Sequence, residues 1–107
     1  MTLEISFADK SLRQLCENGA IARRKLGSKV AEKLKRRLAD LRAVSCVKEL
    51  VAGRPREVEG IVIVELCGDY RIILCANHNS NPLLKTGAID WSMVNHVKIL
   101  KIEGNHD

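Results

Sequence analysis

Aromatic residues are scarce in this sequence, with one Phe, one Tyr and one Trp among 107 residues. Any hydrophobic core must therefore be mainly aliphatic. The same scarcity leaves little aromatic surface on which single-stranded bases could stack, which argues against a nucleic-acid binder of the stacking-platform type. Hydrophobic residues make up 46% of the chain and charged residues 29%, a composition typical of a globular protein. We expect a single domain over residues 1–107 with one modest core.

The cysteines lack the spacing of a metal site. Cys16, Cys46, Cys67 and Cys75 form no C-x-x-C pair, and none has a histidine at ligand spacing. We therefore expect neither a zinc site nor any other cofactor, and reduced, buried thiols fit the pattern best.

A long apolar run is also missing from residues 1–10, MTLEISFADK, where a secretion signal or a membrane span would need one. We therefore expect a cytoplasmic protein with no membrane partner. Lysine and arginine exceed aspartate and glutamate by 18 to 13, for a formal net charge of +5. This excess indicates a polyanionic partner only weakly, because solvated basic faces are common.

The centre of the chain, residues 61–79, has the pattern of two apolar strands joined by a turn at Gly68-Asp69. Gly68 can take the positive φ of a tight turn at no steric cost. A two-residue loop predicts the pairs Cys67–Tyr70, Leu66–Arg71 and Ile63–Leu74. Because both faces of this hairpin would be largely apolar, we expect central strands covered on both sides.

Arg71 is the exception in this hairpin, since a guanidinium is always charged and its neighbours are apolar. Two interpretations are open. In the first, Arg71 extends to solvent or pairs with a carboxylate such as Glu65 or Glu59; in the second, it binds a phosphate. Chemistry alone favours the first.

Helical signals precede the hairpin. Asp9 is expected to cap a helix over 10–17, which Asn18-Gly19 ends in a turn. A second helix is expected over about 20–43, with a break or kink near Gly27-Ser28. Its apolar positions step by three and four along one side: Leu26, Val30, Leu34, Leu38 and Leu41. Its other side is basic, which indicates a solvated face more often than contact with nucleic acid.

The remaining segments complete the fold prediction. A half-buried strand is expected over 2–7, and 45–60 is expected to be a loop after a short turn at 47–50. A polar, turn-rich segment over 77–92 leads to a last strand over 94–102. The order β-α-α-β-β-β predicts an α+β domain, with two N-terminal helices packed on one face of a small, mostly antiparallel sheet.

Several of these features together resemble one family. The basic helix carries Ala31, Leu34, Leu38 and Leu41, Leu50 follows it, and after a loop comes Gly68-Asp69-Tyr70-Arg71 ahead of apolar residues. This combination resembles the RelE/ParE toxin superfamily, and within it the HigB-like "killer" branch of type II toxin–antitoxin systems (plasmid maintenance). The segment 102–106 is similar to the closing strand of that family, which tends to end in Asp-Tyr-His.

The resemblance implies a RelE-like fold and a metal-independent, ribosome-dependent endoribonuclease. Such an mRNA interferase cuts mRNA in the A site of the 30S subunit and so inhibits translation. Cleavage to a 2′,3′-cyclic phosphate needs a base near the 2′-hydroxyl, cations on the developing phosphorane charge and an acid for the leaving 5′-oxygen. The implied partners are a cognate antitoxin protein and mRNA on the ribosome, with no small-molecule ligand.

The resemblance also assigns residues to roles. Arg71 would bind the scissile phosphate, Arg56 would be a second catalytic cation, and His106 would be the general acid or base. His78 and His96 are alternatives to His106. Further contacts to nucleic acid are expected from Arg54, Lys98, Lys101, Lys33 and Arg37. The pair at Arg54 and Arg56 flanks Pro55 in a short basic loop, which suits contact with phosphates.

Two other functions stay open. One is a ParE-like poison of DNA gyrase that cleaves no RNA, and the other is an antitoxin-binding, regulatory module without catalysis. Gly104 and Asn105 stand where the family pattern has Asp and Tyr. The basic loop and His106 favour the ribonuclease, whereas the missing aromatic favours these alternatives.

Overall fold

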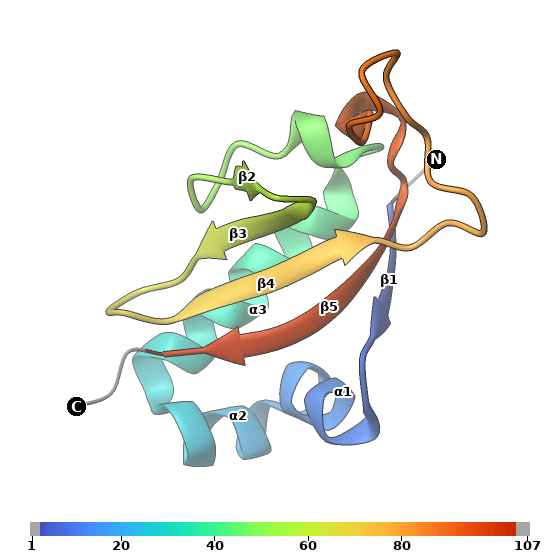
Figure 1. The fold of residues 1–107 in the computed structure, drawn as a ribbon. Helices are drawn as coiled ribbons and strands as arrows, with labels where there is room; N and C mark the ends of the chain where they lie inside the picture. Colours follow the sequence, from blue (N-terminus) through green and yellow to red (C-terminus); the bar gives the residue numbers. More distant parts are fainter. Residues whose placement is uncertain (1–2, 105–107) are drawn as a thin grey trace.

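The computed structural model describes residues 3–104. These residues form β1 (Glu4–Phe7), α1 (Lys10–Glu17), α2 (Gly19–Leu26), α3 (Ser28–Ala43), the 3-10 helix η1 (Val47–Glu49), β2 (Arg56–Val58), β3 (Ile61–Glu65), β4 (Arg71–Ala76), the 3-10 helix η2 (Trp91–Met93) and β5 (His96–Glu103). The helical layer lies against one face of the sheet (Figure 1). The predicted α+β class is confirmed, but the described chain has three helices and five strands where two and four were expected.

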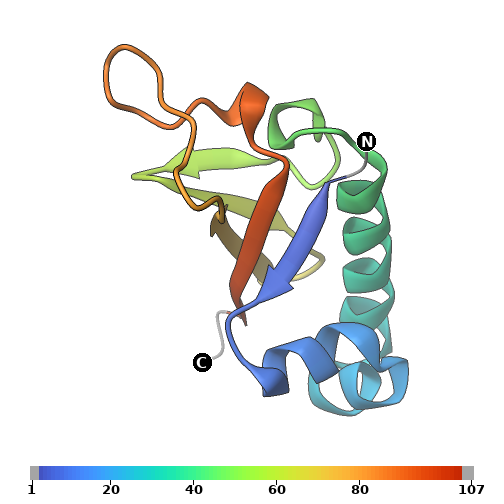
Figure 2. The same ribbon diagram turned by 90° about the vertical axis from the view of Figure 1, so that its right-hand side faces the viewer.

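The five strands form one mixed sheet in the order β1-β5-β4-β3-β2. β1 runs parallel to β5, and the other neighbours are antiparallel. Figure 2 shows β1 and β5 side by side, with β1 at the edge of the sheet. The prediction of a mostly antiparallel sheet is therefore confirmed, and β5 is a central strand between β1 and β4.

Side-chain caps explain where α1 and α2 begin. The carboxylate of Asp9 accepts a hydrogen bond from the N–H of Leu12 at 2.8 Å, as the cap prediction requires. Asn18 ends α1, but it also caps α2, because its side-chain oxygen accepts the N–H groups of Ala20 and Ile21 at 3.0 and 3.2 Å. The expected turn is therefore a single residue between two helices.

The expected long helix over 20–43 is two helices. Gly27 separates α2 from α3 with a φ of 86°, a conformation that residues with a Cβ rarely adopt. The break predicted near this glycine is confirmed. On α3 the apolar stripe is buried as expected: Val30, Leu34, Leu38 and Leu41.

The loop expected over 45–60 is interrupted by η1 and by a strand, β2, that the sequence analysis missed. β2 pairs antiparallel with β3, with Arg56 opposite Ile63 and Val58 opposite Ile61. The two residues between these strands, Glu59 and Gly60, have φ values of 50° and 85°. Two consecutive positive φ values are the geometry of a type I′ hairpin turn, which matches the twist of the flanking strands.

The predicted register of the central hairpin is wrong by one residue. The turn forms as expected, with Gly68 at a φ of 64° and the N–H of Tyr70 donating to the carbonyl of Cys67 at 3.4 Å. The loop is one residue longer than expected, because the N–H of Leu66 donates to the carbonyl of Tyr70 at 2.9 Å and residues 67–69 lie between them. The observed pairs are Glu65–Arg71, Val64–Ile72, Ile63–Ile73, Val62–Leu74 and Ile61–Cys75. A shift of one residue moves a side chain to the other face, so Leu66 stays in the core while Arg71 leaves the row of buried residues.

The expectation that the hairpin is covered on both faces holds only in part: on the face away from the helices Ile73 is 4% exposed, but the residues of β3 are half-buried. Only one face of the sheet has the helical layer against it (Figure 2). The buried side chains of that face come from the three central strands: Val62, Val64, Ile72, Leu74, Ala76, Val97 and Ile99. The alternate residues of β3 are half-buried, as expected for a sheet with one face left uncovered.

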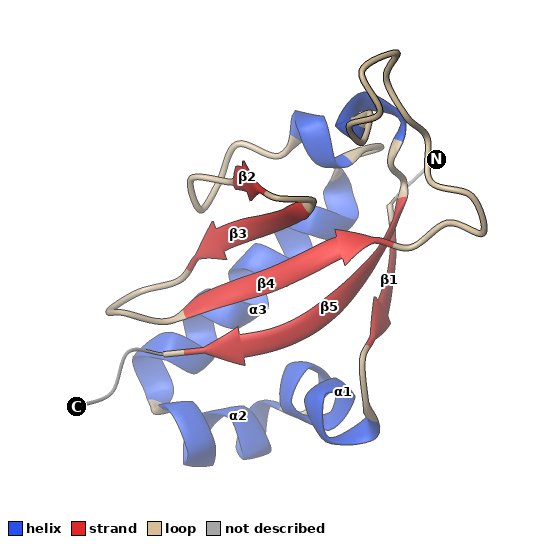
Figure 3. Cartoon of the chain, in the orientation of Figure 1, coloured by secondary structure: helices blue, strands red, loops and turns tan. Residues whose placement is uncertain are grey.

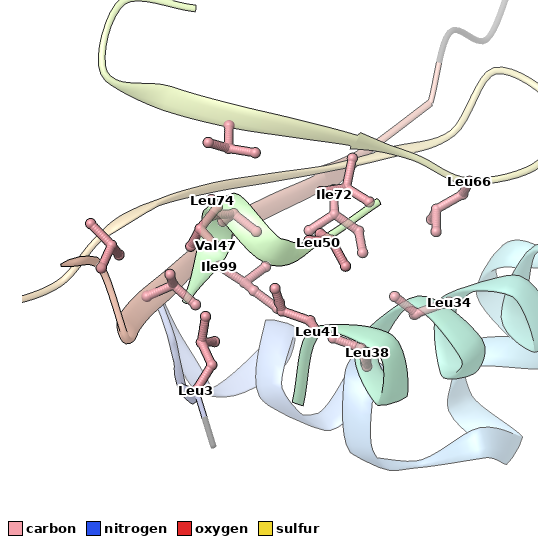
Figure 4. Packing of buried hydrophobic residues seen from close by; sticks show 14 of the residues in the cluster. Leu3, Leu34, Leu38, Leu41, Val47, Leu50, Leu66, Ile72, Leu74 and Ile99 are labelled. Atoms are coloured by element: carbon pink, nitrogen blue, oxygen red, sulfur yellow. The ribbon is translucent and has the colours of Figure 1, made fainter. Parts of the chain in front are cut away.

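The core lies between α3 and this face and is aliphatic, as expected. Figure 4 shows Leu34, Leu38 and Leu41 of α3 packed toward Ile72 and Leu74 of the sheet. The three leucines are each 1% exposed. Burial of one leucine side chain contributes about 1.5–3 kcal/mol, so this stripe anchors the helical layer to the sheet.

Residues 77–92 form the long loop that Figure 3 shows between β4 and β5. It contains η2 and one isolated bridge between Leu83 and Ile89. The last strand was expected over 94–102 and is observed two residues later at its start, as β5. Within residues 3–104, no helix combines the length and the apolar character needed to cross a membrane.

Candidate nucleic-acid interface

The sheet face opposite the helices gathers half of the candidate residues. We call it the open face and define it, from the registers of β2 to β5, by these residues: Arg56, Val58, Ile61, Ile63, Glu65, Arg71, Ile73, Cys75, His96, Lys98, Lys101 and Glu103. Its cations come from three strands, β2, β4 and β5, that lie far apart in the sequence. The fold therefore brings together Arg56, Arg71, Lys98 and Lys101, four of the eight residues expected to act in catalysis or RNA binding.

Arg71 has a carboxylate partner on this face. Its Nε donates to Oε1 of Glu103 at 2.7 Å, while Lys101 Nζ lies 3.0 Å from Oε2 of the same carboxylate. The interpretation that Arg71 pairs with a carboxylate is therefore confirmed, although the partner is neither Glu65 nor Glu59. The Arg71 side chain is 44% exposed, so the pair leaves it accessible to a ligand from solvent.

The pKa of Glu103 depends on both neighbouring cations. Hydrogen bonds from Lys101 and then Arg71 hold the pKa of Glu103 below its ordinary value, since both donors stabilise the ionised form. Glu65 lies directly across from Arg71 on β3. Arg71 is therefore flanked by one acidic residue on each neighbouring strand, and the ionised form of Glu103 is favoured at neutral pH.

A hollow of about 290 Å³ opens beside this pair and is lined by Arg56, Glu65, Gly68, Asp69, Tyr70 and Arg71. Tyr70 lies against Gly104 at the end of β5, because a Cβ built on Gly104 would come within 2.6 Å of Cε1 of the tyrosine ring. Glycine at this position thus leaves room for the ring next to the hollow. The two arginines expected to be catalytic, Arg56 and Arg71, both line it.

Glu103 and Tyr70 are site residues that sequence reasoning did not propose. Tyr70 was noted only as part of the Gly-Asp-Tyr-Arg segment. Glu103 sits 32 residues from Arg71 in the chain, and only the pairing of β4 with β5 brings them together. An acidic residue near the end of the last expected strand was the one available signal.

Three of the other predicted residues lie apart from the hollow. Arg54 is exposed in the segment before β2 and has a φ of 48°. Lys33 of α3 lines a separate groove of about 540 Å³ between α3 and the Gly68 turn. Arg37 of α3 donates from Nη1 to Asp40 at 3.1 Å and is only 20% exposed. His106 lies outside the described residues.

Arg37 has a packing role where nucleic-acid binding was expected. A Cβ built on Gly53 would lie 3.0 Å from both Cδ and Nε of Arg37, so the arginine stem packs directly against that glycine. Its Nε is buried and makes no hydrogen bond within the described part of the chain. The side chain therefore fixes the segment before β2 onto α3.

The two described histidines form a cluster at the other end of β5. Nε2 of His78 accepts the N–H of Asn95 at 3.3 Å, and the rings of His78 and His96 meet edge to face with centroids 5.1 Å apart. Nδ1 of His96 lies 3.6 Å from Oε2 of Glu4. His96 begins β5 whereas the partner of Arg71 ends it, so neither histidine belongs to the hollow.

One cysteine, Cys75, belongs to the open face, where it pairs with Ile61 and Lys98 on the neighbouring strands. The four cysteines are half-buried free thiols. Within residues 3–104, no three His, Cys, Asp or Glu side chains are grouped so as to hold a metal ion. The charged groups of the open face are cations and carboxylates on neighbouring strands of one sheet.

No model of a protein family, no curated protein and no solved structure matches this chain.

Proposed function

We propose that this chain is the toxin of a type II toxin–antitoxin system and acts as a metal-independent, ribosome-dependent mRNA endoribonuclease of the RelE/ParE superfamily, HigB-like branch. The observation that carries the proposal is the convergence of Arg56, Arg71, Lys98 and Lys101 on the sheet face that the helices leave uncovered. Four cations on one rigid face suit a polyanionic chain. By this proposal the chain works in the cytoplasm and is held inactive by a cognate antitoxin.

The arrangement suits cleavage by positioning and electrostatics. In the proposed reaction the 2′-hydroxyl of the RNA attacks the adjacent phosphorus, the bond to the 5′-oxygen breaks, and a 2′,3′-cyclic phosphate forms. Negative charge grows on the non-bridging oxygens in the transition state. Fixed guanidinium groups such as Arg71 and Arg56 stabilise that charge without having to reorganise.

The proton transfers need a base and an acid. His106 is the proposed group, and it follows the end of β5, the strand that carries Lys101 and Glu103 beside Arg71. Its imidazole would take or supply a proton near neutral pH. Tyr70 lines the hollow and is the aromatic side chain nearest in sequence to Arg71. By this proposal it contacts a base or sugar of the bound RNA.

A second candidate is the antitoxin-binding module without catalysis. One observation favours it: Arg71 is already paired with Glu103 and faces Glu65, which lowers the net positive charge of the hollow. No feature of the described residues specifically favours gyrase poisoning, but the experiment below would detect it.

The proposal is tested by inducing the wild-type chain, Arg71→Ala and Arg24→Ala in cells without the antitoxin. Arg24 is an exposed arginine of α2, so Arg24→Ala removes the same charge away from the open face. Growth is followed and mRNA 5′ ends are mapped by primer extension, with and without a translation inhibitor.

The expected result is growth arrest with new, translation-dependent mRNA ends, which Arg71→Ala abolishes and Arg24→Ala retains. Arrest with intact mRNA and an induced DNA-damage response would replace the proposal by gyrase poisoning. The absence of arrest, with the protein folded and abundant, would favour the binding module.

A further inference from the structure

The carboxylate of Glu103 bridges two cations of the open face. Oε1 accepts from Arg71 Nε at 2.7 Å and Oε2 lies 3.0 Å from Lys101 Nζ. Each oxygen thus engages a different cation, as two oxygens of one phosphate would. Glu103 therefore occupies the position at which an anion shared by Arg71 and Lys101 would bind.

A break in strand register creates this arrangement. Between β4 and β5, Ile73 pairs with Lys101 whereas Leu74 pairs with Ile99, so Leu100 is one extra residue on β5. Val97 and Ile99 point to the helices and are fully buried. Without the extra residue, strict alternation would send Lys101 and Glu103 to that same face.

The bulge at Leu100 therefore redirects two charged side chains onto the open face, beside Arg71. Bulges commonly re-aim side chains next to functional sites. The alternative would be a lysine and a glutamate in the apolar core, which is costly. Both charged residues thus reach Arg71 through one local feature of the backbone.

We propose that Glu103 is a built-in competitor for a phosphate-binding position formed by Arg71 and Lys101. In the free chain its carboxylate holds the two cations together, and a phosphodiester of bound RNA displaces it. This inference rests on the proposed function for the identity of the ligand, a single-stranded RNA, but the anion position itself is defined by the three side chains.

Exposure makes the displacement feasible. The side chains of Arg71, Lys101 and Glu103 are 44%, 60% and 32% exposed. Ion pairs at such positions are weak, because water screens both charges. A phosphodiester, like a carboxylate, has two oxygens that share one negative charge, but in RNA it comes with neighbouring phosphates that Lys98 or Arg56 can contact, so the RNA chain is the stronger ligand.

The plain structural alternative is an ion pair that only joins β4 to β5. The two roles predict opposite effects of Glu103→Gln on ligand binding. Removal of a competitor tightens binding, whereas removal of a clamp that positions Arg71 weakens it or leaves it unchanged.

The first measurement is the Kd of a short, fluorescently labelled single-stranded RNA for the wild type, Glu103→Gln and Glu17→Gln, by anisotropy. Glu17 is the matched control, since it also pairs with an arginine, Arg13 at 3.0 Å, but lies on α1 away from the open face. Both substitutions raise the net charge by one. We expect Glu103→Gln to bind about two- to fivefold more tightly than Glu17→Gln, the range of one weak ion pair. Equal or weaker binding by Glu103→Gln would overturn the inference.

The second measurement keeps the test independent of RNA. The Arg71 Nε–H resonance of the 15N-labelled chain is followed by NMR while inorganic phosphate is added. Phosphate should shift this resonance at lower concentration in Glu103→Gln than in the wild type or Glu17→Gln. If no variant binds RNA but this difference is present, RNA fails as the ligand of this position in the free chain and the competitor role of Glu103 stands for phosphate; the proposed function keeps its own test in cells. If the phosphate titrations of Glu103→Gln and Glu17→Gln coincide, the competitor role fails.

Discussion

Arg71 and Glu103 face each other across β4 and β5, and a hydrogen bond of 2.7 Å joins their side chains. The pair lies on the open face, where it is partly exposed. It links the last residue of β5 to the first residue of β4 and sets the charge of the hollow beside them. We therefore expect anion binding to depend on this pair more than the stability of the fold does, and substitutions can measure the two effects separately.

Replacement of Arg71 by alanine should affect binding far more than folding. An exposed ion pair contributes about 0.2–1 kcal/mol, so Arg71→Ala is expected to lower the free energy of unfolding by no more than about 1 kcal/mol. Chemical denaturation of the purified variant measures this. A loss several times larger would mean that the arginine is a structural residue, and the toxicity result could not then be assigned to catalysis.

The pKa of Glu103 should depend on both of its donors. Hydrogen bonds from Lys101 and Arg71 hold it below the ordinary value of 4.5. Because the folded-state pKa is lower than the unfolded one, the contribution to stability is complete above about pH 4.5 and is lost as the pH falls through the lowered pKa. Lys101→Met should raise this pKa, as followed by the Glu103 carboxyl carbon in NMR. Titration of the wild type at the ordinary value would show that the pair does not persist in solution.

Burial raises the pKa of the Cys16 thiol from 9.0 to about 12, against a smaller opposing effect of Arg42. At pH 8 only about one thiol in ten thousand would then be ionised. Alkylation of Cys16 by iodoacetamide should be very slow in the folded chain and complete in denaturant, as followed by mass spectrometry. Since the folded-state pKa is the higher one, this thiol stabilises the fold below about pH 9 and its contribution declines as the pH rises. Rapid alkylation of the folded chain would contradict the burial.

Structural features that depend on a few neighbouring residues were predicted correctly from the sequence. Asp9 caps α1, Gly27 separates α2 from α3, and the apolar stripe of α3 is buried. Each depends on chemistry within one or two turns of the chain. The gathering of cations from β2, β4 and β5 needed the sheet order as well, which the sequence alone did not establish.

Single extra residues explain the rest of the differences. The three-residue loop 67–69 of the hairpin and the bulge at Leu100 in β5 each shift a register by one, and together they place Arg71 and Glu103 on the same face. Alternation of apolar residues does not reveal such shifts, because both faces of these strands contain aliphatic side chains.

The strand β2 was not predicted for a different reason. Glu59 adopts a φ of 50° in the turn after it, where Asn, Asp or Gly would have been the recognisable signal.

Among the glycines around β2, we expect Gly53→Ala to lower the free energy of unfolding the most. Gly53 and Gly60 have nearly equal φ values, 83° and 85°, but their surroundings differ. A Cβ on Gly53 would lie 2.5 Å from Cγ1 of Val64 and 3.0 Å from Arg37, whereas nothing lies within 4 Å of a Cβ on Gly60. The pair of substitutions therefore separates the backbone strain, which both share, from the clash, which only Gly53 has.

Gly60→Ala is expected to lower the free energy of unfolding by about 1–2 kcal/mol, the penalty of a left-handed conformation for a residue with a Cβ. Gly53→Ala should cost about 1–3 kcal/mol more, since Val64 is in the core and the stem of Arg37 is held by Asp40. Urea denaturation of both variants measures the difference. Equal losses would mean that the segment moves away from α3 at little cost, and Arg37 would then be free to act at the surface, as the sequence had indicated.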